Sequence, residues 1–290
     1  MALSLNSRVE SKTLLMKYYN LPQPADKIQL MYVWVDGFGR NLRCKTMTVD
    51  KEPVSPDAMR YCGQGQLSAQ IDKERISATT RADIFVGPHY CAVGDTKSQW
   101  REVMEAHYRA CLYAGFNIST PNPDVMPSQW EFRIGPCVGV AAGDHFWMSR
   151  FILHRVAEDF GVTITSDPKP VPGDWNGSGA HINSSTLTMR QPGGIKSIEE
   201  AIDKLSERHQ EHLEQYDPKG GADNERRLTG HHGTSRFDSF TSGVGNYGSI
   251  VRIPKHLAKV QRGYLEDREI AANRDPYCVT ALHVETTCLM

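Results

Sequence analysis

The sequence predicts an α+β fold, because both strand and helix patterns occur within its 290 residues. Polar and apolar residues alternate from Gln129 to Ile134, which is the two-residue period of a half-buried strand. From Ser197 to Tyr216 the apolar residues recur with helical spacing instead. Ile28 to Val35 and Leu42 to Val49 are β-prone runs joined by turn residues, and together they predict a hairpin.

Composition limits the classes of partner and compartment. The 33 Lys and Arg residues nearly balance the 34 Asp and Glu residues, and no charged run stands out. We therefore expect neither nucleic acid nor an anionic membrane as a partner. Residues 1–30 contain no long apolar run, which predicts no signal peptide and no membrane span. The seven cysteines lack a Cys-x-x-Cys pair, which favours reduced thiols and a cytoplasmic location over a disulfide or a zinc site.

The N-terminal stretch is interpreted as an arm followed by the hairpin. Within residues 1–26, a short helix is predicted from Ser11 to Tyr19, ended by two prolines. One face of the first hairpin strand carries Met31, Val33 and Val35. Two strands alone are marginal in water, so the hairpin needs further packing partners.

The stretch from Asp124 to Cys137 organises the middle of the chain. Glu131 and Arg133 face away from the apolar side of the predicted strand, and Gly135-Pro136 ends it. The apolar side consists of Trp130, Phe132 and Ile134. Taken alone, the alternation is typical of an edge strand with a solvated acid.

Asp124 and Glu131 are candidates for a shared cation only if the chain folds back between them. Seven extended residues span about 23 Å. Carboxylate oxygens bind Ca²⁺ or Mg²⁺ at only about 2–2.6 Å. Proline in Met126-Pro127-Ser128 makes a turn plausible at that point.

Three helices are predicted in the remaining chain. Arg101 to Ala114 is ended by Gly115. Asp144 to Phe160 begins with Asp144 as its N-cap and precedes Gly161, and Ser197 to Tyr216 begins with a capping box of Ser197 and Glu200. Core positions are expected at Met148, Phe151, Ile152, Arg155, Val156 and Phe160, and at Ile198, Ala201, Ile202, Leu205 and Leu213. His209 and His212 are expected on or beside a solvated face, because the pair has no recognised metal-binding pattern.

Several motifs in one order resemble those of eukaryotic-type glutamine synthetases. They are Asp124-Val-Met-Pro-Ser-Gln-Trp-Glu-Phe-Arg-Ile-Gly-Pro-Cys137, Glu105-Ala-His-Tyr-Arg-Ala-Cys-Leu-Tyr-Ala-Gly115, Pro172-Gly-Asp-Trp-Asn-Gly-Ser-Gly-Ala-His181, Arg226-Arg-Leu-Thr-Gly230 and Gly263-Tyr-Leu-Glu-Asp-Arg268. The resemblance covers about Lys27 to Asp50 and nearly all of the chain from Gly87 to Met290. It implies a C-terminal catalytic domain with a curved antiparallel sheet and flanking helices, preceded by a truncated β-grasp remnant.

The resemblance also implies four stretches. Residues 1–26 form the arm, 27–53 the β-grasp remnant, 54–86 an atypical linker and 87–290 the catalytic domain. The family's Asn-Phe-Asp-Gly-Ser-Ser loop and its metal-binding Glu-x-Glu strand have no counterpart in the sequence. The first of these reaches into a neighbouring subunit in the family, so its loss removes an intersubunit wall.

By resemblance, the reaction joins ammonia to the side chain of glutamate with ATP, through a γ-glutamyl phosphate. Mg²⁺ or Mn²⁺ would be held by Asp124 and Glu131 in one cluster and by His181 and Glu266 in a second. Asp124 replaces the family's usual glutamate. Each cluster lacks the member that the Glu-x-Glu strand supplies, which should weaken cation binding.

The same resemblance assigns nucleotide and substrate contacts. The ATP-binding positions are Glu131, Phe132, Arg133, Ile134, Gly135, Pro136, Asn183, Ser184, Ser185, Arg252, Tyr264, Leu265 and Glu266. The glutamate-binding positions are Asp174, Trp175, Arg227 and Arg268. The catalytic positions are Arg268, Arg252 and Arg227. Outside the resemblance, isolated arginines are most often solvated surface residues.

Three further positions depart from the family pattern. Asp174 replaces an asparagine, so an acceptor-only anion faces an anionic substrate. Gly233 replaces the glutamate of a closing flap, and Tyr247 replaces an arginine, whose charge and forked donors it cannot supply.

The departures leave the functional interpretation open. The sequence favours a glutamine synthetase-like ligase of impaired activity. The alternatives are an inactive relative that binds nucleotide or assembles with active subunits, and a chain too incomplete to fold stably. A homo- or hetero-oligomer with family members is expected in the first two cases.

Overall fold

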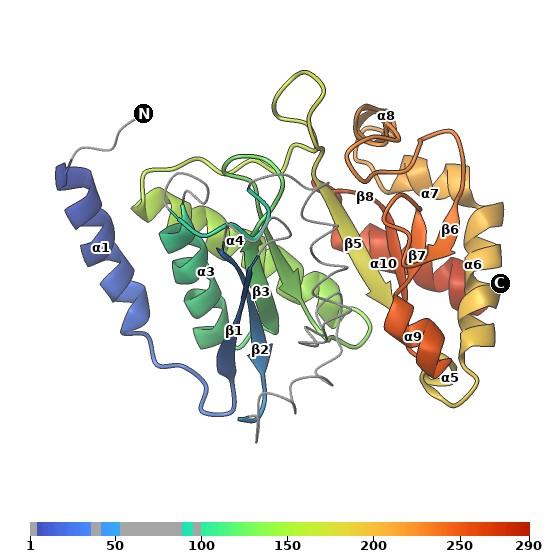
Figure 1. Ribbon diagram of the computed structural model, residues 1–290, viewed down its shortest axis with the longest axis horizontal. Coiled ribbons are helices and arrows are strands. Elements are labelled where there is room, and N and C mark those ends of the chain that lie inside the picture. Colours follow the sequence, from blue (N-terminus) through green and yellow to red (C-terminus); the bar gives the residue numbers. More distant parts are fainter. Residues whose placement is uncertain (1–4, 36–41, 53–88, 95–99) are drawn as a thin grey trace. The chain divides into compact units, whose positions relative to one another are not determined.

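The computed structural model describes residues 5–35, 42–52, 89–94 and 100–290 (Figure 1). The chain divides into two compact units, residues 1–164 and 165–290. This boundary falls inside the stretch 87–290 that the sequence treats as one domain. The predicted linker 54–86 and the turn at Asp36-Gly-Phe-Gly lie outside the described residues.

The hairpin of the first unit has the predicted bounds. Strands β1 (Ile28–Val35) and β2 (Leu42–Val49) pair antiparallel over their full length. The inner face of β1 is not the one carrying Met31 and Val33, which are 52% and 60% exposed. The side chains that pack together are Ile28, Leu30 and Trp34 of β1 with Met47 and Val49 of β2. Helix α1 (Leu5–Tyr19) ends as predicted but begins before Ser11.

The second hairpin of this unit contains the predicted fold-back. Strands β3 (Ile118–Pro123) and β4 (Trp130–Ile134) are antiparallel, with Asn122 opposite Glu131. The Asp124 amide donates to the Gln129 carbonyl at 2.8 Å, and the Gln129 amide donates to the Met126 carbonyl at 3.1 Å. These bonds close the turn at Met126-Pro127-Ser128. As predicted, Trp130 and Phe132 pack into the core.

Helices α3 (Arg101–Tyr113) and α4 (Ala141–Asp159) cover these strands. Asp144 is not an N-cap, because α4 begins at Ala141 and Asp144 lies within its first turn. The predicted stripe on α4 is also partly wrong, since Met148 and Phe151 are exposed. The buried side is rotated, and it consists of Gly143, Ser149, Leu153, Val156 and Ala157. On this side the backbone carbonyl of the buried Ser149 lies 2.9 Å from His107 Nε2 of α3.

The second unit is built on a four-stranded sheet in the order β5-β8-β7-β6. Its strands are β5 (Gly179–Ser184), β6 (Ser242–Val244), β7 (Val251–Ile253) and β8 (Leu265–Ala271). Its helices are α5 (Leu187–Arg190), α6 (Ile195–Glu207), α7 (His209–Gln215), α8 (Ala222–Arg227), α9 (Lys255–Val260) and α10 (Pro276–Val284), followed by a π-helical turn Glu285–Leu289. The pairs β5–β8 and β8–β7 are antiparallel, whereas β6–β7 is parallel.

The long helix predicted from Ser197 to Tyr216 is two helices. Arg208 has a non-helical backbone between α6 and α7. The capping box is wrong, because α6 begins at Ile195 after Gly194, where a side chain would collide with the Met189 carbonyl. The predicted buried stripe is confirmed. Its residues Ile198, Ala201, Ile202 and Leu205 pack against β7 and β8, and Leu213 of α7 is also buried.

His212 contradicts its predicted solvated position. It is fully buried, and its Nε2 lies 2.8 Å from the Thr286 hydroxyl. His209 is largely covered, with Nδ1 2.7 Å from a Glu269 carboxylate oxygen. Burial lowers the pKa of His212 to about 4. No helix among the described residues is long and apolar enough to cross a membrane.

Candidate active site

A row of polar residues crosses three strands of the second unit. In the sheet register, Glu266 of β8 lies between Asn183 of β5 and Arg252 of β7. Side chains two residues apart on a strand share a face, so His181 and Arg268 project on this side as well. Val251 and Ile253 project to the opposite face, where they pack in the core with α6. The sheet therefore separates a charged face from an apolar one.

Glu266 is the centre of the charged face. It is 1% exposed. Its Oε1 lies 3.2 Å from His181 Nδ1 and 3.6 Å from Arg268 Nη1, and its Oε2 accepts from Arg252. Burial alone would raise the pKa of Glu266, but the His181 hydrogen bond and the two guanidinium charges hold it well below its usual value. Glu266 is thus an anion at neutral pH with three cationic or polar donors around it.

Tyr247 touches this cluster through Arg252. The Arg252 guanidinium lies over the Tyr247 ring, 4.4 Å from its centroid. Such a contact is a favourable cation–π interaction. At a position where the sequence predicts a departure from the family pattern, the tyrosine ring therefore contacts Arg252.

The two predicted nucleotide segments of this unit are neighbours. Ser184 lies opposite Leu265, and the Ser185 hydroxyl donates to the Gly263 carbonyl at 2.6 Å. The segments 183–185 and 264–266 are consequently adjacent at the end of the β5–β8 pair where β5 ends and β8 begins.

The predicted flap contacts the same cluster. Arg268 Nη2 donates to the Gly233 carbonyl at 3.3 Å. His232 Nε2 lies 2.8 Å from Asp174 Oδ1, and this hydrogen bond lowers the pKa of the Asp174 carboxyl. His232 thus links Asp174 to the loop of Gly233, and both residues are ones that the sequence predicts to depart from the family pattern. The neighbouring Trp175 is about half exposed.

Arg227 lies inside the fold. It is 3% exposed, and its Nη2 donates to the Glu269 carbonyl at 2.6 Å and to the Asn224 side-chain oxygen at 3.0 Å. A side chain on Gly177 or Gly179 would collide with it. Burial and the nearby Arg268 lower the pKa of Arg227 to about 10. Its donors are directed at protein acceptors, whereas its assignment as a glutamate ligand stays a prediction.

The first unit contains a second charged cluster around Glu131. Lys45 Nζ lies 3.3 Å from Glu131 Oε1, and Arg133 Nη2 lies 4.0 Å from the same oxygen. Burial raises the pKa of Tyr90, and the nearby charges of Glu131 and Asp124 raise it further. Asp124 therefore contributes to the same cluster as Glu131. The fold-back thus places both predicted acids near Tyr90.

Lys45 is the site residue that the sequence did not reveal. Its side chain is completely buried. Burial, together with Arg133, lowers the pKa of Lys45, and Glu131 partly opposes this. Lysine is rarely buried unless paired, and its position in a β-prone run carries no sign of its partner.

At both predicted cation clusters a basic side chain lies against the carboxylate. Glu131 Oε1 lies 3.3 Å from Lys45 Nζ, and Glu266 accepts from Arg252 and lies 3.6 Å from Arg268 Nη1. His181 adds a nitrogen donor 3.2 Å from Glu266, so this cluster pairs an imidazole with a carboxylate, two donor types that suit Mn²⁺. Among the described residues no group of three or more His, Cys, Asp or Glu could hold a metal ion.

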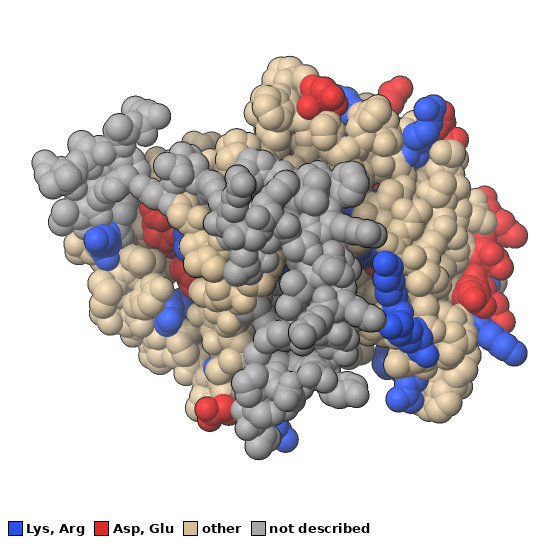
Figure 2. All heavy atoms as spheres, in the orientation of Figure 1, with Lys and Arg blue, Asp and Glu red and all other residues tan. Residues whose placement is uncertain are grey.

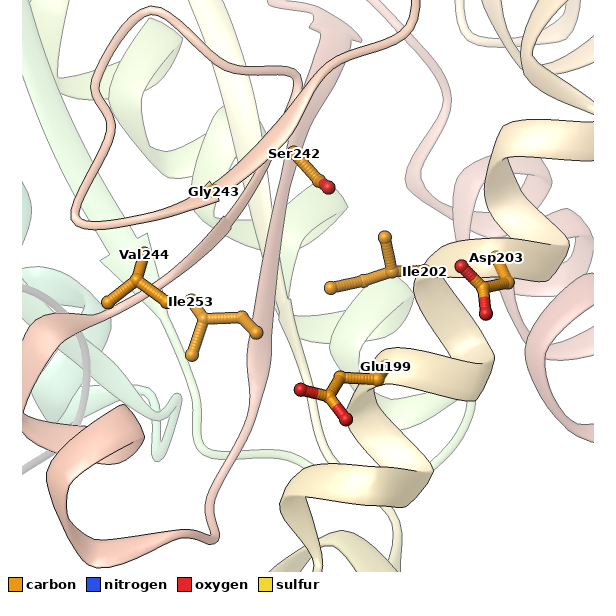
Figure 3. A pocket seen from close by; sticks show the side chains of 7 residues that line it. All are labelled: Glu199, Ile202, Asp203, Ser242, Gly243, Val244 and Ile253. Atoms are coloured by element: carbon orange, nitrogen blue, oxygen red, sulfur yellow. The ribbon is translucent and has the colours of Figure 1, made fainter.

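A shallow pocket of about 230 Å³ lies away from this chemistry, between α6 and the β6–β7 edge (Figure 3). Its lining residues are Glu199, Ile202, Asp203, Ser242, Gly243, Val244 and Ile253. In Figure 3 the two carboxylates project from α6 at its rim. Because Ile253 lines it, the pocket is on the helix side of the sheet, opposite Arg252.

The visible surface carries charges of both signs (Figure 2). Acidic side chains gather over α6, and basic ones over α9. This mixture agrees with the formal charge of −1 and gives no extended field of one sign.

The chain is similar in sequence and in fold to known proteins of one family. The family described as "Glutamine synthetase, catalytic domain" matches residues 63–210, beginning inside the predicted linker. The glutamine synthetase of Gallus gallus is 42% identical over 364 residues, covering all of this chain and 97% of the relative. That of Rattus norvegicus is 43% identical with the same coverage. Because 364 aligned positions exceed the 290 residues of the chain, parts of these relatives have no counterpart here.

The solved structures give the same result for the fold. The cryo-EM structure of Plasmodium falciparum glutamine synthetase matches with a TM-score of 0.59 at 15% identity. The match covers 97% of this chain but 54% of that one, so the chain spans about half of the solved relative. At this identity the likeness concerns the fold alone. With the full-length relatives, it shows that this chain has the glutamine synthetase fold and belongs to the glutamine synthetase family.

Proposed function

We propose that the chain is an ATP-dependent ligase of weakened activity, which joins ammonia to the side-chain carboxylate of glutamate. The observation that supports this best is the row of Asn183, Glu266 and Arg252 with His181 and Arg268 beside it. These residue types suit a reaction in which negative charge moves between a carboxylate and a phosphate.

Different residues of the second unit would have different roles in this reaction. Arg252 and Arg268 would stabilise charge on the transferring phosphoryl group and on the acyl oxygen. His181 and Glu266 would hold Mg²⁺ or Mn²⁺, which would neutralise phosphate charge. Gly233 binds Arg268 through its carbonyl, so the flap loop lies over Arg268 and can limit access of water.

Three features account for the weakening. Glu131 is engaged by Lys45, Arg227 is buried among protein acceptors, and the flap carries no carboxylate at position 233. These features also support the second candidate, an inactive family member that binds nucleotide or joins active subunits. For either candidate we propose a cytoplasmic protein. We also propose a homo- or hetero-oligomer with relatives, because Met31 and Val33 of the hairpin are exposed apolar residues that could contact another subunit.

Calorimetric titration with ATP and Mn²⁺ tests the proposal. We expect binding at micromolar to millimolar nucleotide, weakened at least tenfold by His181→Ala, because that change removes a cation ligand. His154→Ala, which removes an exposed histidine of α4 in the first unit, is the control. Phosphate release that needs both glutamate and ammonium would identify the ligase, whereas binding without release would favour the inactive relative. No heat at millimolar nucleotide would contradict the ligase and the nucleotide-binding relative, and would leave only an inactive chain that joins active subunits.

Asp174→Asn should improve glutamate binding. The change removes an exposed anion from the predicted substrate loop, so we expect a severalfold lower dissociation constant for glutamate at fixed ATP and Mn²⁺. Asp238→Asn removes another exposed carboxylate, paired with Arg236 at 2.6 Å, and should leave this constant unchanged. Equal or weaker binding by Asp174→Asn would show that its contact with His232 matters more than its charge.

A further inference from the structure

Two carboxylates lie in the core of the second unit, both on strand β8. Asp267 is 1% exposed and Glu269 is 3% exposed. Burying an unpaired carboxylate anion is strongly unfavourable, and two buried anions close together also repel each other. Each group therefore needs either partners that stabilise its negative charge or a proton that removes it.

Asp267 has partners that suit its anionic form. Its Oδ1 accepts a hydrogen bond from the Glu269 backbone amide at 3.0 Å, and its Oδ2 lies 3.5 Å from His283 Nδ1 of α10. Burial alone would raise the pKa of Asp267, but His283, the backbone amide and the nearby His212 of α7 hold it below its usual value. Asp267 is therefore the ionised member of the two carboxylates.

The carboxylate of Glu269 has a different neighbour. Its Oε1 lies 2.7 Å from His209 Nδ1 of α7. The other ring nitrogen, His209 Nε2, is buried and has no hydrogen-bond partner among the described residues. A charged imidazole carries an N–H on both nitrogens, and a buried N–H without an acceptor costs more on a charged ring than on a neutral one. The surroundings of His209 thus favour a neutral ring over an ion pair with Glu269.

Arg227 of α8 is the permanent cation near Glu269, but it is directed elsewhere. Its Nη2 donates to the backbone carbonyl of Glu269 at 2.6 Å, and its other hydrogen bonds go to the Arg268 carbonyl and the Asn224 side-chain oxygen. Burial raises the pKa of Glu269 to about 7, and the charge of Asp267 adds to this, whereas His209 and Arg227 oppose it.

We propose that Glu269 is a buried proton-binding group, which holds a proton against His209 at and below neutral pH and releases it to solvent as the pH rises. In the protonated form the Glu269 hydroxyl donates to His209 Nδ1, and Asp267 is the single anion of the pair. After release, both carboxylates are anions in the same core, and the second unit is less stable. The proposal goes beyond the proposed function, because it holds whether or not the chain binds nucleotide.

The direction of the pH effect follows from the two pKa values of Glu269. Its folded pKa of about 7 lies above its unfolded value of 4.5. Its contribution to stability is therefore present below about pH 4.5 and is lost as the pH rises through the folded pKa. His212 acts in the opposite direction, because its folded pKa of about 4 lies below its unfolded value of 6.5. The effect of His212 cancels when a Glu269 variant and the unaltered chain are compared at one pH.

Denaturant unfolding of the full chain and of Glu269→Gln, at pH 5 and at pH 7, tests the proposal. Glutamine resembles the protonated glutamate in shape and charge. We expect the unfolding constant of the unaltered chain, divided by that of the variant, to rise at least tenfold from pH 5 to pH 7. Glu211→Gln is the matched control, since it alters an exposed glutamate of α7 that pairs with Arg208 at 2.6 Å. Its ratio should change less than twofold.

An ion pair between Glu269 and His209 would give the opposite result. Glu269→Gln would then lose at least as much stability at pH 7 as at pH 5, and this outcome would overturn the proposal. If the variant does not fold, the unaltered chain labelled with ¹³C at the glutamate side-chain carboxyl carbons decides. One resonance should titrate with a midpoint within about one unit of pH 7, and no such titration above pH 6 would overturn the proposal. Neither measurement involves nucleotide, so neither result bears on the proposed ligase activity.

Discussion

Glu266→Gln is expected to destabilise the chain by about 3–5 kcal/mol, because it leaves the buried Arg252 without its counter-charge. The melting temperature should fall, and nucleotide binding with Mn²⁺ should fall with it. The exposed Glu285, paired with Arg208 at 3.2 Å, provides a control. Glu285→Gln should cost no more than about 1 kcal/mol.

A double-mutant cycle separates the pair from the burial of its members. Arg252→Met should also be strongly destabilising, but the double variant should cost less than the sum of the two single changes. Additive costs would show that the two residues do not stabilise each other.

Protonation of Glu266 at low pH should destabilise the chain, as Glu266→Gln does. The folded pKa of Glu266 lies below its unfolded value of 4.5. Its contribution to stability is therefore present above about pH 4.5 and is lost as the pH falls through the folded pKa. Between pH 7 and pH 3 the unaltered chain should lose more stability than Glu266→Gln.

Arg227→Met is expected to cost about 3–5 kcal/mol. The change removes the guanidinium that donates to the Glu269 carbonyl, the Arg268 carbonyl and the Asn224 side-chain oxygen. These hydrogen bonds are buried or partly buried. Each acceptor left unpaired costs about 1–3 kcal/mol. Chemical unfolding measures the loss directly.

The exposed Arg236 is a control for Arg227. It pairs with the exposed Asp238 at 2.6 Å. Arg236→Met should therefore cost about 1 kcal/mol or less. If Arg227→Met kept full stability and lost only glutamate binding, Arg227 would be a substrate ligand, and its proposed role in stabilising the fold would be wrong.

Local sequence patterns predicted the elements whose partners are close in the chain. The alternation through β4, the hairpin of β1 and β2, and the turn at Pro127 appear as expected. The motifs around Glu131, His181 and Glu266 also identified the family, because several long motifs occur in one order. Helix starts were less predictable. Helices α4 and α6 begin after Val140 and Gly194, and neither residue forms the side-chain cap that would mark a helix start in the sequence.

Burial depended on packing between distant segments. The exposed Phe151 and the buried Ser149 lie two residues apart on α4, and helical spacing allows either side to face the core. The choice depends on α3, since His107 bonds the Ser149 carbonyl. His212 is buried for a similar reason, because its partner Thr286 lies 74 residues away in the C-terminal π-helical turn.

The sequence by itself determined the family and the strand that carries Glu131, and it predicted the residues that depart from the family pattern. Only the tertiary structure decided what those residues contact. Lys45 and Glu131 are 86 residues apart, and Asp174 and His232 are 58 apart. Hydrophobic periodicity records which side of an element is buried, but it carries no information about which charge lies opposite. A charge pair depends on distance in space, and folding sets that distance through backbone contacts elsewhere in the chain.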